Sequence, residues 1–206
     1  MNIVLCENAE NRLFTAGNKA RTDTVKILTD YGYKHMPLFT SKSNRALVAF
    51  NMISSCFRSV LSAKKDETIF IQYPYYPFVV NKCLVNALCF GRLFKHYSIK
   101  LLIHDSMGLR NIEGNKKIVK SEIRLLNKVD VVICHNAKMS QFFFRNGGVR
   151  NYEVLGPFDY LYEGEMAKKS VAGEKTIVIA GNLAKEKCGY LYDINKHSNI
   201  LYPQTH

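Results

Sequence analysis

The stretch that decides the fold is Lys100-Leu101-Leu102-Ile103-His104-Asp105-Ser106-Met107-Gly108-Leu109-Arg110. A short apolar run that breaks into polar residues predicts a strand buried on both faces, as in a parallel sheet. Ligands of open α/β sheets bind beyond the carboxyl ends of the strands, so His104, Asp105 and Arg110 follow the strand where a site is expected. A structural alternative stays open, in which Asp105 caps the following turn and His104 is a core histidine.

The composition is that of a globular protein with a preference for anionic partners. The chain has 206 residues, of which 47% are hydrophobic and 22% are charged. This length suffices for one α/β domain and part of another. Lys and Arg total 29 against 17 Asp and Glu, giving a net charge of +12, which favours nucleotide phosphates, nucleic acid or an acidic membrane. Because the basic residues are spread along the chain, we expect no nucleic-acid partner.

Cysteine usage and hydropathy indicate a cytoplasmic protein. The six cysteines form no C-x-x-C pair and most lie in apolar runs, which predicts reduced core cysteines instead of disulfides or a zinc site. The first residues lack the basic and apolar segments of a signal peptide. The longest apolar stretch, residues 78–94, is interrupted by polar residues and is too short to span a bilayer. We therefore expect at most peripheral contact with the inner face of a membrane.

Strands alternate with helices through residue 155. The pattern predicts strands at residues 2–6, 33–38, 68–72, 99–103, 129–134 and 151–155, and helices at residues 19–31, 44–61, 78–94, 118–129 and 137–145. This order predicts an α/β fold with a Rossmann-like, doubly wound, largely parallel sheet. In helix 44–61 the spacing places a set of mostly apolar side chains on one face. Its members are Ala46, Leu47, Phe50, Ile53, Ser54 and Phe57.

The domain organisation follows from a change in composition after the sixth strand. We expect one domain over residues 1–160 and a linker over residues 161–175, rich in Glu, Lys, Ala and Gly. A new strand pattern from residue 176 predicts the start of a second α/β unit, although about 30 residues cannot build a separate core. In the first domain, the loop at Thr15 and Gly17 offers backbone N–H groups to a phosphate, but a plain strand-to-helix connection is the favoured interpretation.

Short motifs recur in order along the chain. They are Lys19-Ala20 with Asp23, Ile71-Gln72-Tyr73-Pro74, Ile103-His104-Asp105 with Arg110, His135-Asn136-Ala137-Lys138-Met139, Phe158-Asp159-Tyr160, and Gly181-Asn182-Leu183 with Leu191-Tyr192. Together they resemble a family of bacterial sugar transferases that includes the glucosyltransferase of serine-rich adhesin glycosylation and related galactofuranosyltransferases. The resemblance covers essentially the whole chain. Each motif alone has little specificity, but the ordered set is fairly specific.

The resemblance implies a GT-B architecture, in which two Rossmann-like domains face each other across a cleft and transfer sugar without a metal ion. The N-terminal domain of such proteins faces the acceptor, and the C-terminal domain supplies most of the nucleotide-sugar site. Residues 1–160 are then the acceptor-side domain, and residues 176–206 are the truncated start of a nucleotide-sugar-binding domain. The chain departs from the family at Ser106-Met107-Gly108, where other members often carry an acidic residue.

Sugar transfer requires a stabilised diphosphate leaving group, a positioned acceptor hydroxyl and a group that takes its proton. By resemblance, Asp105 and His104 are the expected catalytic residues. The expected donor-binding residues are Thr15, Gly17, Arg110, Gly181, Asn182 and Lys185. The expected acceptor-binding residues, lining the cleft, are Gln72, Tyr73, His135 and Asn136. We expect no metal or other cofactor, and a donor that is a UDP-linked sugar.

Two classes of function remain. The first is a glycosyltransferase that moves a sugar to a glycan, glycoprotein or lipid-linked acceptor, inactive or incomplete as this chain alone. The second is a non-catalytic binding or assembly subunit derived from the same domain, acting as a homo-oligomer or with a partner glycosyltransferase. Glycoside hydrolysis is set aside because no paired carboxylates are evident.

Overall fold

The structure is a computed structural model, and it describes residues 2–7, 16–38, 45–76, 78–110, 116–148, 151–156 and 161. The chain divides into two compact units, Met1–Tyr162 and Glu163–His206. The described residues all belong to the first unit, so the predicted linker, apart from Leu161, and the predicted second domain lie outside them. The predicted domain boundaries therefore stay predictions.

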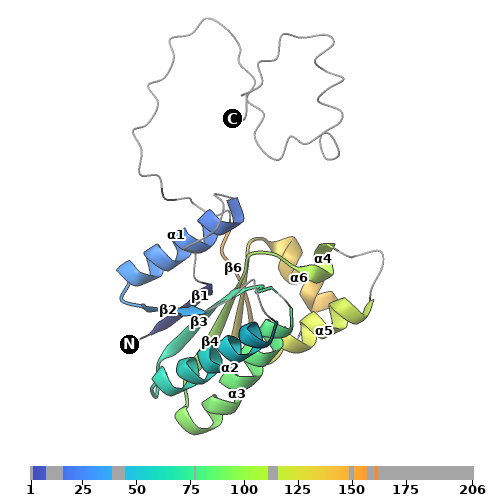
Figure 1. The fold of residues 1–206 in the computed structure, drawn as a ribbon. Coiled ribbons are helices and arrows are strands. Elements are labelled where there is room, and N and C mark those ends of the chain that lie inside the picture. Colours follow the sequence, from blue (N-terminus) through green and yellow to red (C-terminus); the bar gives the residue numbers. More distant parts are fainter. Residues whose placement is uncertain are drawn as a thin grey trace, which may run out of the picture. The chain divides into compact units, whose positions relative to one another are not determined.

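A six-stranded sheet forms the centre of the first unit (Figure 1). Its strands are β1 (Ile3–Glu7), β2 (Lys34–Leu38), β3 (Thr68–Tyr73), β4 (Ser98–Ile103), β5 (Val131–Cys134) and β6 (Asn151–Val154). The strand order is β2-β1-β3-β4-β5-β6, and every neighbouring pair is parallel. The structure confirms the predicted Rossmann-like α/β fold, and the described sheet is parallel throughout. Its order reverses between β1 and β3, which is where open sheets of this kind form their ligand crevice.

Helices cover both faces of the sheet unequally. They are α1 (Ala16–Asp30), α2 (Arg45–Ser62), α3 (Val79–Lys95), α4 (Met107–Arg110), α5 (Lys116–Leu126) and α6 (Ala137–Arg145). Figure 1 shows α1 on one side of the sheet and α2, α3, α5 and α6 on the other. The larger apolar core lies beneath those four helices, and a smaller cluster around Val4, Phe70 and Leu102 lies beneath α1. The short helix α4 was not predicted.

Two members of the face predicted for α2, Phe50 and Phe57, are both exposed, whereas Ser55, Cys56 and Ser59 are buried. The buried hydroxyl of Ser59 is satisfied by donating to the carbonyl of Ser55 at 2.8 Å. The inward side of α2 meets more than one element, since Ser59 Oγ lies 3.4 Å from Met36 Sδ on β2 and Val60 faces Gly91 on α3. Of the large apolar side chains of α2 that the structure describes, Phe50, Phe57 and Leu61 face outward.

The cysteines follow the prediction in part. Cys6, Cys56 and Cys134 are buried, as expected for small core residues, but Cys83 is exposed on α3. Within the described part of the chain, no helix is long and apolar enough to cross a membrane.

Candidate functional site

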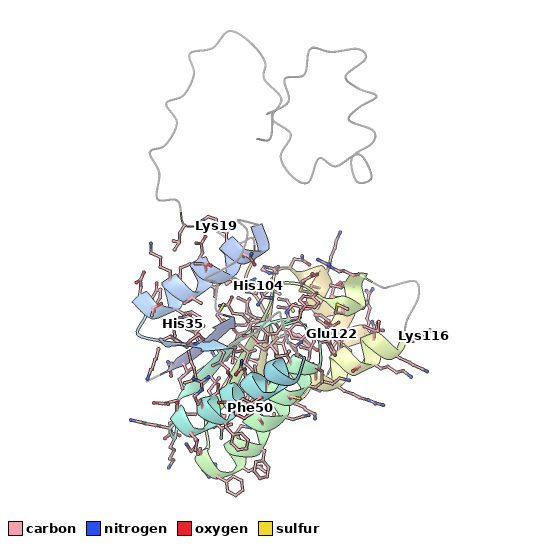
Figure 2. All side chains as sticks on the ribbon, in the orientation of Figure 1. Lys19, His35, Phe50, His104, Lys116 and Glu122 are labelled. Atoms are coloured by element: carbon pink, nitrogen blue, oxygen red, sulfur yellow. The ribbon has the colours of Figure 1, made fainter. Side chains whose placement is uncertain are left out.

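The predicted site residues gather at the carboxyl edge of the sheet because the neighbouring strands end at the same level. Tyr73 at the end of β3 pairs with Ile103 at the end of β4, and the amide N–H of His104 donates to the Tyr73 carbonyl at 2.8 Å. Strand β5 continues the same register, so His135 follows β5 beside His104, and their ring centroids are 6.2 Å apart. His104 is labelled in Figure 2.

A buried glutamine fixes the imidazole of His104. Gln72 is fully buried, and its Oε1 lies 2.7 Å from His104 Nε2. The other end of the Gln72 amide donates to the Arg21 carbonyl at 3.2 Å. Because the amide nitrogen is committed to a carbonyl, Oε1 faces His104, and His104 Nε2 must carry the proton. Arg21 completes the network, since its guanidinium donates to the carbonyls of Gln72 at 3.1 Å and Pro74 at 2.6 Å.

Both histidines at this edge are held in the neutral form. Burial, together with the smaller effects of the charges of Arg21 and His135, lowers the pKa of His104 to about 3. Burial also lowers the pKa of His135, against a raising effect from its hydrogen bond to the Gly156 backbone. An efficient general base has a pKa near the working pH. His104 is therefore better suited to orienting a bound group than to taking its proton.

Asp105 and Arg110 form an ion pair with two contacts. Arg110 Nε donates to Asp105 Oδ1 at 3.0 Å, and a second guanidinium nitrogen contacts Asp105 Oδ2. Asp105 Oδ1 also accepts the Ser106 amide N–H at 2.8 Å. The side chains of Asp105 and Arg110 are 31% and 66% exposed, so a ligand in solution can reach both. Capping of the short helix α4 falls to Ser106, whose hydroxyl accepts the Leu109 amide N–H at 3.1 Å.

Glu122, a residue that the sequence analysis missed, holds this segment in place. It lies on α5 and is fully buried, and it is labelled in Figure 2. Its carboxyl group accepts from the Tyr73 hydroxyl at 2.8 Å and the Ser106 hydroxyl at 2.7 Å. It also accepts the amide N–H groups of Met107 at 3.2 Å and Gly108 at 2.8 Å. A buried carboxyl group needs such partners, and these four tie α5 and β3 to the start of α4.

Comparison with known protein families identifies the kind of domain. The family model described as "Glucosyltransferase 3-like, N-terminal domain" matches residues 2–156. The chain belongs to this family. No curated protein matches the chain. As a glucosyltransferase-like domain, the chain is associated with glycosyl transfer in general.

Two predicted acceptor-binding residues of this glucosyltransferase-like domain are enclosed by protein. Gln72 and Tyr73 are both 0% exposed, and their polar ends contact His104 and Glu122. The expectation that they line a cleft is corrected, because neither offers an exposed atom to an acceptor. Both instead support the residues above them. Of the neighbouring tyrosines, Tyr75 is also fully buried and Tyr76 is exposed.

The other two predicted acceptor-binding residues are more accessible. His135 is half-buried, and Asn136 is exposed. Asn136 is the N-cap of α6, and its side-chain oxygen accepts the Met139 amide N–H at 2.9 Å. Its structural role as a cap is therefore established, and its contact with an acceptor remains a prediction.

Most of the predicted donor-binding residues lie outside the described residues. Gly17 lies in the first turn of α1, and Arg110 pairs with Asp105. Thr15, Gly181, Asn182 and Lys185 lie outside the described residues. Across the described ranges, no group of three His, Cys, Asp or Glu side chains is arranged to hold a metal ion. The expectation of metal-independent transfer stays a prediction.

Two side chains of α1 make contacts with a distant part of the chain that the sequence did not indicate. Lys19 and Asp23 form an ion pair at 3.0 Å, and both hold the backbone of Leu161. Lys19 Nζ donates to the Leu161 carbonyl at 2.6 Å, and Asp23 Oδ2 accepts the Leu161 amide N–H at 2.9 Å. The motif Lys19-Ala20 with Asp23 therefore anchors the chain after β6.

Proposed function

We propose that the chain is the acceptor-side domain of a GT-B glycosyltransferase that uses a nucleotide-sugar donor, with a UDP-linked sugar as the preferred class. The observation that carries the proposal is the accessible Asp105–Arg110 pair beside a neutral histidine at the carboxyl edge of the sheet. The family match supports the same chemistry. A carboxylate and a guanidinium are the groups needed near an acceptor hydroxyl and a departing diphosphate.

In the proposed reaction, Asp105 takes the proton of the acceptor hydroxyl. The hydroxyl oxygen forms a bond to the anomeric carbon of the donor while the bond from that carbon to the diphosphate oxygen breaks. The diphosphate leaves with the bonding electron pair, and Arg110 turns from Asp105 to pair with it, since a guanidinium matches phosphate oxygens in a bidentate geometry. His104 orients the acceptor, with His135 and Asn136 beside it.

The remaining donor contacts are assigned by resemblance and belong to the proposal alone. The residues proposed for these contacts are Thr15, Gly17, Gly181, Asn182 and Lys185. Acceptors of three kinds fit the proposal, namely glycans, glycoproteins and lipid-linked sugars.

A binding measurement and a transfer measurement together test the proposal. The purified 206-residue chain is screened against an oligosaccharide panel, the best acceptor is titrated, and UDP release from UDP-sugars is followed with that acceptor. We expect Asp105→Ala to weaken acceptor binding by about tenfold or more, the value of a lost charge-assisted hydrogen bond. Arg92→Ala is the matched control, because Arg92 pairs with Asp130 at 2.7 Å near the start of β5.

The outcomes separate the two classes of function. Acceptor binding with UDP release supports transfer by the chain itself. Binding of a glycan without UDP release favours a non-catalytic binding or assembly subunit. Failure of every glycan to bind, or equal weakening by Asp105→Ala and Arg92→Ala, contradicts the proposed site.

A further inference from the structure

The outer surface of α2 and α3 carries a group of exposed large apolar side chains. On α2, Phe50, Phe57 and Leu61 are 69%, 64% and 70% exposed. On α3, Phe90, Leu93 and Phe94 are 65%, 68% and 70% exposed. We call this surface, defined by these six residues, the α2–α3 face. Phe50 is labelled on α2 in Figure 2.

The apolar residues of the two helices belong to one surface because the helices approach each other closely. Gly91 on α3 faces Val60 on α2, and a Cβ on Gly91 would lie only 2.4 Å from Val60 Cγ1. Lys95 at the end of α3 donates to the Leu61 carbonyl at 2.7 Å. The rings of Phe90 and Phe94 touch edge to face, with centroids 5.3 Å apart. The aromatic residues therefore flank a common helix–helix contact.

This exposure is not a by-product of packing the core. The inward side of α2 uses Ser55, Cys56 and Ser59, whereas Phe57 and Leu61 face outward. A helix that only stabilised this fold would bury its large apolar residues and expose its serines. Clustered apolar side chains on a surface indicate an interaction site. We therefore expect the α2–α3 face to be covered by a binding partner.

The charge around this face identifies the chemistry of what covers it. Neither α2 nor α3 contains an acidic residue. Within residues 45–95 the acidic side chains are Asp66 and Glu67, and Glu67 is buried with its carboxylate accepting the Lys64 amide N–H at 2.7 Å. The basic residues in the same range are Arg45, Arg58, Lys64, Lys65, Lys82, Arg92 and Lys95. Of these, Arg58, Lys64, Lys65 and Lys82 are exposed, whereas Arg92 pairs with Asp130 and Lys95 donates to backbone carbonyls of α2. Exposed phenylalanines on helices that carry exposed cations and no acidic residue favour an anionic partner with an apolar interior.

We propose that the α2–α3 face docks on the surface of a membrane rich in anionic lipids. Helices lying in the interface place Phe and Leu side chains into the acyl boundary, while Lys and Arg pair with headgroups. Long lysine stems can follow apolar surface and still reach the phosphates. A second copy of the chain is a poorer occupant, because it would set one basic surface against another. The proposal does not depend on the sugar-transfer activity.

Vesicle binding by the full chain tests the proposal. The chain is co-sedimented with phosphatidylcholine vesicles, with or without phosphatidylglycerol. We expect binding only to the anionic vesicles, and the double variant Phe57→Ser/Phe94→Ser should bind at least about tenfold more weakly because two buried rings are lost. Phe144→Ser is the matched control, since Phe144 is 71% exposed but lies on α6. Lys64→Glu/Lys65→Glu should weaken binding by about fivefold or more per site.

Clear results would overturn the proposal. One is equal binding to neutral and anionic vesicles. Another is an equal loss of binding in Phe57→Ser/Phe94→Ser and Phe144→Ser. A third is a dimer in solution that Phe57→Ser/Phe94→Ser converts to a monomer without any effect on vesicle binding, which would assign the face to a second copy. Circular dichroism confirms that each variant is folded, as expected for changes at exposed positions.

Discussion

Gln72 Oε1 accepts a hydrogen bond from His104 Nε2 at 2.7 Å, and this contact joins a fully buried amide to the half-buried edge of the candidate site. The amide is fixed from behind by the Arg21 carbonyl, so the imidazole has one tautomer and one orientation. The neutral state of His104 is a consequence of the same burial. Because the buried imidazole resists protonation, we expect the protein to lose stability at acidic pH.

We predict that stability falls as the pH is lowered through the range in which unfolded histidine takes a proton and folded His104 does not. Because burial lowers the pKa of His104 to about 3, this range extends from its ordinary value of 6.5 down to about 3. In this range the unfolded state binds more protons, so the free energy of unfolding decreases with falling pH, by up to about 1.4 kcal/mol per pH unit for one group. Urea unfolding at several pH values measures the slope.

The variant His104→Asn should flatten this pH dependence, and His96→Asn should not. His96 is an exposed histidine at the C-cap of α3, with a left-handed φ of 54° that asparagine tolerates. An unchanged slope in His104→Asn would show that another group is responsible.

Replacing Glu122 should destabilise the domain, because its carboxyl group serves four buried donors. In Glu122→Gln an amide nitrogen must face at least one of those donors, so we expect the free energy of unfolding to fall by about 1–3 kcal/mol. Urea unfolding at neutral pH measures the loss. The exposed residue Glu153 on β6 provides the control, and Glu153→Gln should change stability by less than about 0.5 kcal/mol. Similar values for both variants would contradict the anchoring role of Glu122.

Gly91 should tolerate no side chain while Val60 is present. The Cβ of Gly91→Ala would meet Val60 Cγ1 at 2.4 Å and the Tyr97 hydroxyl at 2.6 Å, so we expect a destabilisation of about 1–3 kcal/mol. Val60→Ala removes the contact with Val60 and leaves the one with Tyr97, so Val60→Ala/Gly91→Ala should be less destabilised than the sum of the single variants. Additive losses measured by thermal unfolding would show that the two helices adjust without a clash.

The anchor at Leu161 can be measured at a single amide. Asp23→Ala removes the acceptor of the Leu161 N–H, and we expect hydrogen exchange at that amide to accelerate about tenfold. Lys19→Ala removes the donor to the Leu161 carbonyl and leaves the N–H bond in place, so its effect at this amide should be smaller. Equal acceleration in the two variants would mean that the ion pair acts as one unit.

The inner strands β1, β3, β4 and β5 were predictable because they are largely apolar runs, and a pattern of that kind is a local signal. On α2 the spacing places Phe50 and Phe57 on one side of the helix, and that side faces solvent. Spacing shows that residues share a helix face, but it does not show which face meets the core. That depends on contacts with elements distant in sequence, as where Val60 faces Gly91 on α3 and Ser59 Oγ lies 3.4 Å from Met36 Sδ on β2.

The site residues that directly follow a strand could be predicted from the sequence, whereas the buried residue that supports them could not. His104, Asp105 and Arg110 follow β4 directly, so their position beyond the sheet follows from its topology. Glu122 gave one signal, a carboxylate within the apolar stripe of an amphipathic helix that includes Ile123 and Leu126. A buried acid in such a stripe needs partners, but sequence spacing does not reveal that they come from β3 and the start of α4.

Lys19, Arg21 and Asp23 occupy little more than one turn of α1, yet they contact two distant parts of the chain. Lys19 and Asp23 hold Leu161, and Arg21 holds the carbonyl of Gln72 beneath His104. One rigid helical turn is thus a mechanical link between the point where the chain leaves this unit and the histidine at the site. A strain applied at Leu161 has a path of three contacts to the imidazole, from Leu161 to α1, from Arg21 to Gln72 and from Gln72 to His104, and no flexible loop lies on it.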